Sequence, residues 1–150
     1  MEESRKAKLR ALKILTRLDK TEQELEDALN RAGFSPEAVR EAMDYVRSFG
    51  YLNDANYARK YVECYKDRKS RQKIRYDLMR KGIGKELVDE AIEKCEDMDE
   101  LDVLRRALHK KWNCEEKPDE KNLNRIAASL SRQGFSSHDI WQVLREENLT

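Results

Sequence analysis

The chain has few of the residues that interrupt helices, and it lacks any strand pattern. Its 150 residues include five glycines and two prolines, and no run of alternating β-branched residues occurs. So few helix breakers, together with the missing strand pattern, are typical of a nearly all-helical fold. We therefore expect an all-α protein.

Cysteines and long apolar runs are also scarce. The three cysteines, Cys64, Cys95 and Cys114, are far apart and form no CxxC pair, which argues against a disulfide framework and against a zinc site. No apolar stretch approaches the roughly 20 residues that span a bilayer, and the N-terminus lacks the apolar segment of a secretory signal. We expect a cytoplasmic protein with no membrane segment, no metal and no cofactor.

Sets of catalytic residues are missing as well. His109 and His138 are isolated, and the sequence has no Ser/His/Asp set, no Cys/His set and no glycine-rich phosphate loop. Carboxylate pairs at helical spacing, such as Glu90 with Glu93, are commonplace in a chain with 41% charged residues. We predict that the protein is not an enzyme.

What the sequence does contain is a hydrophobic pattern repeated around Gly33, Gly82 and Gly134. Leucine or isoleucine lies eight and four residues before each glycine, and apolar residues lie one, six, nine and ten residues after it. This spacing predicts one helix that ends at the glycine and a second helix that begins after it. Because the glycines are about 50 residues apart, the pattern indicates an array of supersecondary units.

Each glycine-centred pair of helices has a further helix before it, so we predict nine helices in three groups of three. The predicted repeats are residues 1–50, 51–97 and 98–150. Thr21 with Glu24 has the spacing of a capping box, and Ser35-Pro36 supplies an N-cap and a first-turn proline. Residues 113–118 lengthen one connection, which makes the third repeat the least regular. Thin repeats suit a chain with 39% hydrophobic residues and predict an elongated, curved array.

Charge is distributed unevenly although the formal net charge is only +1. Residues 54–85 hold eleven Lys and Arg against four Asp and Glu. Residues 86–103 hold nine acidic residues against Lys94 alone. The basic stretch therefore predicts a surface for a polyanion or for an acidic protein.

A candidate contact surface lies in this basic stretch. On the expected helix 70–81, Ile74 and Leu78 mark the buried side, which places Lys73, Tyr76 and Arg80 on the outer side. Two cations beside an exposed ring can hold phosphates and stack or pack against a partner; a solvated helix face with one exposed tyrosine is the alternative. The full set of predicted partner- or DNA-binding residues is Arg59, Lys60, Lys66, Arg68, Lys69, Lys73, Tyr76 and Arg80.

Other aromatic residues have a structural interpretation. Tyr57, Tyr61 and Tyr65 recur every four residues, which predicts a core stripe with phenolic oxygens at the surface rather than a ladder for base stacking. We expect Trp112 and Trp141 to anchor the core of the third repeat, and an exposed partner contact is the alternative for them.

A stand-alone DNA-binding protein of the helix-turn-helix type is the rival interpretation, because two short helices joined by a glycine turn are its local signature. The charges argue against it. The helix after Gly82 would be the recognition helix, yet it carries Glu86, Asp89, Glu90 and Glu93, which DNA phosphates repel. We keep this interpretation as the alternative function.

A set of short motifs runs through the second repeat. It consists of Gly50-Tyr51-Leu52-Asn53-Asp54, Tyr57-Ala58-Arg59, Tyr61-Val62, Ile74-Arg75, Leu78 and Lys81-Gly82-Ile83. The outer repeats add Gly33-Phe34 and Gly134-Phe135-Ser136. Together these motifs resemble the RecX family of bacterial recombinase regulators, over almost the whole chain.

The resemblance implies three tandem three-helix repeats and no reaction of the protein's own. It also implies that the protein binds the RecA recombinase filament, lies in its helical groove and mostly inhibits strand exchange and RecA-stimulated repressor cleavage, in DNA repair and the SOS response. We expect the partners to be the RecA filament and single- or double-stranded DNA. We also expect a monomer whose second repeat is the main contact.

Overall fold

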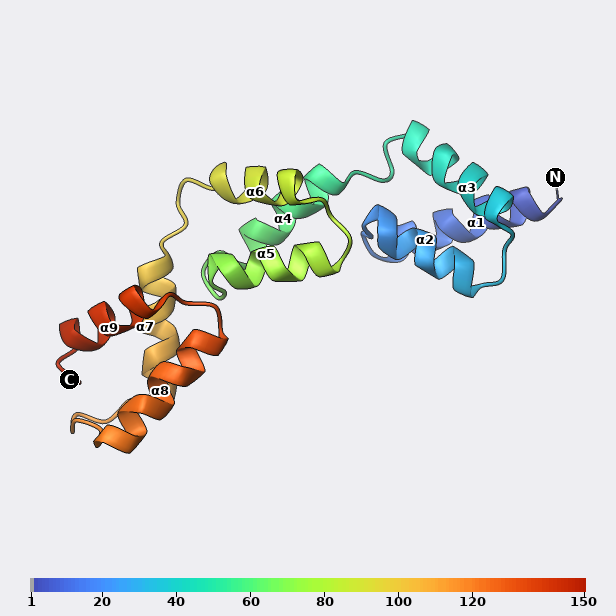
Figure 1. Ribbon diagram of the computed structural model, residues 1–150. Helices are drawn as coiled ribbons and strands as arrows, with labels where there is room; N and C mark the ends of the chain where they lie inside the picture. The colour runs from blue at the N-terminus through green and yellow to red at the C-terminus, as the bar shows by residue number, and fades with distance from the viewer. Residues whose placement is uncertain (1) are drawn as a thin grey trace. The chain divides into compact units, whose positions relative to one another are not determined.

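The computed structural model describes residues 2–150, and within this range it contains helices and loops but no strand. Nine helices follow one another along the described chain (Figure 1). This confirms the all-α prediction and the grouping of the helices by threes. Their bounds are α1 Glu2–Arg17, α2 Glu22–Arg31, α3 Pro36–Ser48, α4 Asp54–Tyr65, α5 Arg71–Arg80, α6 Lys85–Glu93, α7 Glu100–Lys111, α8 Glu120–Arg132 and α9 Ser137–Glu146.

The chain forms two compact units. The first comprises residues 1–60 and 77–91, and the second comprises residues 61–76 and 92–150. The second repeat therefore contributes to both units. None of the helices between residues 2 and 150 is long and apolar enough to cross a bilayer. The predicted repeat boundaries and the elongated, curved arrangement stay predictions.

The first unit is built around the core of helices α1, α2 and α3, in which α1 packs mainly against α3. Leu25 and Leu29, which lie eight and four residues before Gly33, are fully buried there. The predicted inward stripe is thus correct. The buried residues of this core are Ala7, Ala11, Leu25, Leu29, Ala38, Val39, Ala42, Met43, Val46 and Leu52.

The second unit contains the core of helices α7, α8 and α9. Trp112 and Trp141 are half-buried and pack against this core, which confirms their predicted structural role. The Trp112 indole also donates a hydrogen bond to the Glu116 carbonyl over 3.0 Å. The buried residues of this core are Val103, Leu104, Leu108, Ile126, Leu130, Phe135, Ile140, Val143, Leu144 and Leu149.

Helices α5 and α8 end in left-handed glycine turns. Gly82 has φ +92° and Gly134 has φ +98°, a conformation that side chains with a Cβ rarely adopt. The next N–H reaches back to close the last turn, because Ile83 donates to the Leu78 carbonyl over 3.2 Å. Phe135 donates likewise to Leu130 over 3.3 Å. These are Schellman caps, and they confirm the glycines as helix stops.

Each unit contains a similar joint between one helix N-terminus and one of these glycine turns. The hydroxyl of Thr21, the N-cap of α2, donates to the Lys81 carbonyl over 2.6 Å. The hydroxyl of Ser70, just before α5, donates to the Gln133 carbonyl over 2.8 Å. Thr21 and Ser70 each lie twelve residues before the glycine of their own repeat. The repeated sequence therefore builds the same contact twice.

A carboxylate completes each joint. The Glu22 N–H, at the start of α2, donates to Asp54 over 2.9 Å, and the Arg71 N–H, at the start of α5, donates to Glu100 over 2.7 Å. An anion at a helix N-terminus satisfies an otherwise unpaired N–H and interacts favourably with the helix dipole. We call these contacts the first joint (Thr21, Glu22, Asp54, Lys81) and the second joint (Ser70, Arg71, Glu100, Gln133).

The first joint should give folding stability a distinct pH dependence. Burial raises the pKa of Asp54, even though Glu22 donates a hydrogen bond to it. Because the folded state then holds the proton more tightly than the unfolded chain, ionisation of Asp54 lowers stability as the pH rises above about 4. Asp54→Asn keeps an acceptor oxygen without burying a charge.

We therefore expect the stability of Asp54→Asn, relative to the parent protein, to increase as the pH is raised from about 3 to about 6. Urea unfolding of both proteins at several pH values in this window measures the difference. A difference that stays constant with pH would contradict the role assigned to the Asp54 charge.

Candidate interaction surface

The predicted contact residues are divided between the two units. Arg59, Lys60 and Arg80 belong to the first unit. The second unit contains the remaining five, which are Lys66, Arg68, Lys69, Lys73 and Tyr76.

The second unit has a basic pocket of about 430 Å³ beside the second joint. Four predicted residues, Arg68, Lys69, Lys73 and Tyr76, meet there with Arg132 at the end of α8. Sequence reasoning missed Arg132, because it is 56 residues from Tyr76 in the chain. No residue lining this pocket is acidic, and four of the lining residues are Lys or Arg, so the lining is basic. The remaining lining residues are Ser70, Gln72, Gln133 and Gly134.

Tyr76 is the exposed aromatic residue of this pocket. Its relative exposure is 56%, as its predicted outward position requires. The half-buried Lys73 places its Nζ 5.2 Å from the centre of the Tyr76 ring, within cation–π range. The ring is therefore partly held in place while its outer face stays available to a partner.

Tyrosines of α4 hold the other two predicted cations of the pocket. The Lys69 Nζ lies 4.1 Å from the Tyr65 ring centre and donates to the Tyr61 hydroxyl over 2.9 Å. The Arg68 guanidinium lies 4.8 Å from the same Tyr65 ring. Tyr61 and Tyr65 are half-buried, and so is Tyr57. They position cations rather than offer a free stacking ladder, in agreement with the predicted structural role.

Lys66 is engaged within the chain. Its Nζ donates to Glu63 over 3.1 Å and also to Asp97, and only 17% of its side chain is exposed. The hydrogen bonds that Lys66 donates to Asp97 and, second, to Glu63 raise the pKa of Lys66, and Lys66 in turn lowers the pKa of Asp97. A partner would have to displace these two carboxylates to reach the ammonium group.

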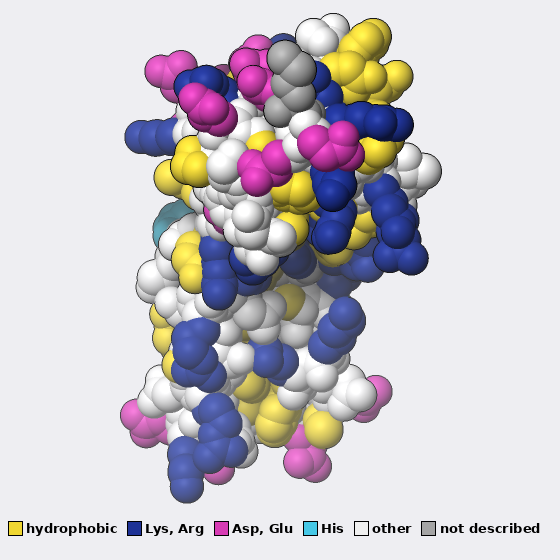
Figure 2. Space-filling model, turned by 90° about the vertical axis from the view of Figure 1, so that its right-hand side faces the viewer, with side chains coloured by type: hydrophobic (Ala, Val, Ile, Leu, Met, Phe, Trp, Pro, Cys, Tyr) yellow, Lys and Arg dark blue, Asp and Glu magenta, His cyan; other side chains and the backbone are white. Residues whose placement is uncertain are grey.

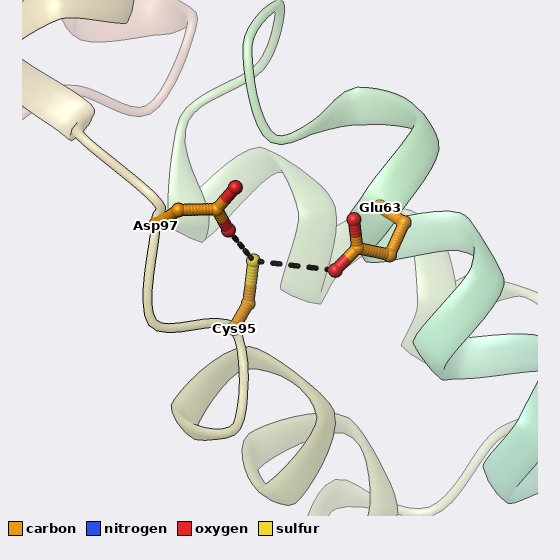
Figure 3. A group of neighbouring side chains, drawn as sticks. All are labelled: Glu63, Cys95 and Asp97. Atoms are coloured by element: carbon orange, nitrogen blue, oxygen red, sulfur yellow. Dashed lines mark hydrogen bonds between the residues drawn. The ribbon is translucent and has the colours of Figure 1, made fainter.

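The same carboxylates flank a buried thiol. Figure 3 shows the Cys95 sulfur between Asp97 and Glu63, at 3.4 Å and 3.9 Å from their oxygens. Three such groups within 4.8 Å resemble a set of metal ligands. However, Lys66 already pairs with both carboxylates, and burial raises the pKa of Cys95, which keeps the thiol protonated. The cluster therefore acts as an ion-pair network that fastens the segment after α6 to α4.

The predicted residues of the first unit are more exposed. The Arg59 guanidinium donates to Asn56 over 2.6 Å, and the Lys60 Nζ lies 3.4 Å from an Asp19 oxygen. Arg80 is exposed and, among the described residues, has no carboxylate within ion-pair distance. Of the three, Arg80 is the cation most available to a partner.

A second concentration of positive charge, on α1, was missed by sequence reasoning. Residues 5–20 hold seven Lys and Arg against Asp19 alone, a contrast that the same charge count would have found. Lys6, Arg10, Lys13 and Arg17 follow one another at intervals of four, three and four residues, so they share one side of the helix. We call these four residues the α1 cationic stripe.

Figure 2 shows one face of the molecule with its charged side chains coloured. Lys and Arg predominate across the middle and lower part of this view, whereas Asp and Glu gather toward its upper and lower edges. Lys and Arg side chains thus gather on the surface in a way that the formal net charge of +1 does not reveal.

The fold and this surface define a class of protein: an all-α repeat protein with a basic surface pocket. Three family models agree with the repeats: "RecX, first three-helix domain" matches residues 7–45, the second domain matches residues 53–92 and the third matches residues 98–144. The chain belongs to the RecX family, whose members are named regulatory proteins.

Curated relatives match along nearly the whole chain. Regulatory protein RecX of Caldanaerobacter subterraneus subsp. tengcongensis is 33% identical over 150 residues, which cover 99% of this chain and 72% of the relative. Regulatory protein RecX of Clostridium botulinum (strain Eklund 17B) is 29% identical over 139 residues, which cover 91% of this chain and 66% of the relative. The chain thus spans about two thirds to three quarters of the length of these relatives.

Solved structures share the fold. The crystal structure of RecX from Lactobacillus salivarius superposes with a TM-score of 0.82 at 25% identity, covering 99% of both chains. A further crystal structure, of a regulatory protein RecX, gives a TM-score of 0.82 at 22% identity and covers 96% of this chain and 72% of that one.

Proposed function

We propose that this chain acts as a cytoplasmic monomer that binds the RecA–DNA filament and modulates, mostly by inhibition, its recombinase and co-protease activities in DNA repair. Membership of a family of regulatory proteins across all three repeats supports a regulatory role. The observation that carries the proposed contact is the acid-free basic pocket of the second unit, with Tyr76 exposed at its side.

The pocket suits a regulator because its cations are arranged before a partner arrives. The second joint fixes Ser70 against Gln133, which brings the start of α5 to the end of α8 and places Lys73 beside Arg132 in one pocket. A preorganised site loses less conformational entropy on binding than a flexible one. Its positive charge complements phosphates or acidic side chains of the filament, and the Tyr76 ring adds contact area.

A double charge reversal on α5 tests the pocket residue Lys73 together with Arg80, the exposed cation of the first unit. We expect Lys73→Glu with Arg80→Glu to weaken inhibition of RecA strand exchange by roughly tenfold or more, because opposite charge becomes like charge at two contacts. Helix content should not change, since both positions lie away from the buried side of α5. Binding to filament preassembled from RecA, nucleotide and single-stranded DNA is measured at two salt concentrations, with circular dichroism to verify folding.

The matched control is Lys121→Glu with Arg125→Glu on α8, which changes the net charge equally at two exposed cations outside the pocket. Unaltered inhibition by the α5 variant, or equal losses in both variants, would remove Lys73 and Arg80 from the contact. Tight binding of the parent protein to bare duplex DNA, with no stronger binding to filament, would favour the stand-alone DNA-binding alternative instead.

A further inference from the structure

The α1 cationic stripe forms a straight row of charge. Its four cations lie along twelve residues of α1, from Lys6 to Arg17, so eleven steps of 1.5 Å make the row roughly 16 Å long. At 3.6 residues per turn the four positions stay within about 60° of the helix circumference. Ala7 and Ala11 are fully buried on another side of the helix, which fixes the direction of the stripe away from the core.

These cations are available to an external ligand. All four are exposed, and none forms an ion pair or side-chain hydrogen bond with another residue of the described chain. The acidic groups that contact or flank α1 lie near its ends, among them Glu41 of α3, which accepts a hydrogen bond from the Ser4 hydroxyl. Glu2 and Glu3 lie in the first turn, where Glu3 accepts a hydrogen bond from the Ser35 N–H, and Asp19, beyond the last turn, pairs with Lys60.

Two cations of the middle repeat differ in this respect. Lys66 is shared between two carboxylates, and Lys81 pairs with Glu24 over 3.4 Å. A cation that already has a carboxylate partner gains less binding free energy from an external anion, because the existing ion pair must be weakened or broken. Unpaired surface cations keep their full charge for a polyanion, and the release of counterions from that polyanion favours binding.

The composition of the stripe favours nucleic acid over protein. Protein interfaces depend on aromatic or apolar anchors buried at their centre. The stripe itself contains no such anchor, and the exposed apolar residues on or directly after α1 are Leu9 at 57% and Leu18 at 63% exposure. A row of Lys and Arg on flexible stems instead suits phosphates, which are contacted without regard to sequence. One DNA strand carries a phosphate about every 3.4 Å, so the row covers about five phosphates.

We propose that the α1 cationic stripe binds the phosphate backbone of a nucleic acid. The surface lies in the first unit and does not include any residue of the basic pocket through which the protein is proposed to contact the filament. The two surfaces would allow one molecule to contact the filament and a nucleic-acid strand through different charges.

Neutralising half of the stripe tests the proposal without RecA. Binding of the full chain to labelled single-stranded and duplex DNA is measured by fluorescence anisotropy over a series of salt concentrations. For Lys13→Gln with Arg17→Gln, we expect the slope of log affinity against log salt to decrease by about 1.4 on single strands or about 1.8 on duplex. Affinity at low salt should fall about tenfold.

The control, Lys121→Gln with Arg125→Gln, removes the same charge from exposed positions of α8 and should leave the salt slope unchanged. An unchanged slope in the α1 variant, or equal changes in both variants, would overturn the proposal. So would a poly-glutamate chain that binds the parent protein more tightly than DNA does and loses its affinity in the α1 variant, since that result identifies an acidic protein as the ligand.

The result of this DNA-binding experiment does not depend on whether the proposed regulatory function is correct. Loss of DNA binding in the α1 variant, together with retained binding to the RecA filament, supports two separate surfaces. If the α5 charge reversal has no effect on inhibition while the α1 variant loses its salt slope, the filament contact is wrong and the nucleic-acid surface stands.

Discussion

Gly134→Ala is expected to lower the free energy of unfolding by about 3 kcal/mol, because it combines backbone strain with a steric clash. The φ of +98° costs an alanine about 1–2 kcal/mol. In addition, a Cβ at this position would lie 2.5 Å from the Ser70 hydroxyl oxygen and 3.2 Å from the Gln72 Cβ. Moving Ser70 breaks its bond to the Gln133 carbonyl, which adds about 1–2 kcal/mol.

Gly82→Ala tests the equivalent position of the first joint. A Cβ there would lie 2.3 Å from the Gln23 Cβ, which is fixed to the α2 backbone and cannot rotate away. We expect a similar loss of about 3 kcal/mol, since the strain at φ +92° is added to a displacement of α2.

Gly33→Ala separates the two causes. Gly33 has φ +91°, yet no atom lies within 4 Å of a Cβ built there, so only the conformational cost of about 1–2 kcal/mol applies. Urea unfolding followed by far-UV circular dichroism measures all three variants. Equal losses in the three variants would show that the joints contribute nothing beyond the glycine turns themselves.

Thr21→Val should destabilise the protein by about 3 kcal/mol, although valine has nearly the same shape as threonine. The Thr21 side chain is completely buried and acts twice, accepting from the Glu24 N–H over 3.1 Å and donating to the Lys81 carbonyl over 2.6 Å. Loss of the N-cap costs about 1 kcal/mol. A buried carbonyl without a donor costs about 1–3 kcal/mol more.

Ser35→Ala is the matched control for this variant. Ser35 caps α3 by accepting from the Ala38 N–H over 3.2 Å, and its hydroxyl takes no part in a joint. We expect it to lose only about 1 kcal/mol, the ordinary value of an N-cap. Thermal and urea unfolding of both variants give the difference that belongs to the first joint, and equal losses would contradict its contribution.

Local features of the fold could be predicted because each depends on residues within about one helical turn. The Thr21–Glu24 capping box, the Ser35 N-cap and the helix stops at Gly82 and Gly134 all occur where the sequence placed them. In each case the donor, the acceptor or the permitted φ belongs to neighbouring residues, so no knowledge of packing was needed.

The joints could not be predicted in the same way. Of the adjacent residues Asn53 and Asp54, only Asn53 caps α4, by accepting from the Asn56 N–H over 3.0 Å. Asp54 accepts instead from Glu22, which is 32 residues away. An Asn or Asp residue favours a helix N-terminus because its side chain bonds to neighbouring residues of the chain. Which helix it caps depends on which N-terminus lies close to it once the helices have packed.

The candidate interaction surface could also be predicted only in part from the sequence. A charge count locates the basic stretch, but it does not tell which cations already have partners. Lys66 meets Asp97 from 31 residues away and becomes less available, while Arg132 enters the basic pocket from α8. The α1 cationic stripe is visible in the sequence, yet its importance depends on the lack of partners around it, which only packing reveals.

By itself, the sequence determined the helices, their caps and glycine stops, their buried sides and the threefold repeat, because these follow from side-chain periodicity and hydrogen bonds within a few residues. Only the tertiary structure decided which charges are neutralised, which cations share a pocket and which hydroxyl closes each joint. These properties depend on the distance between side chains far apart in the chain, and that distance is set by how the helices pack.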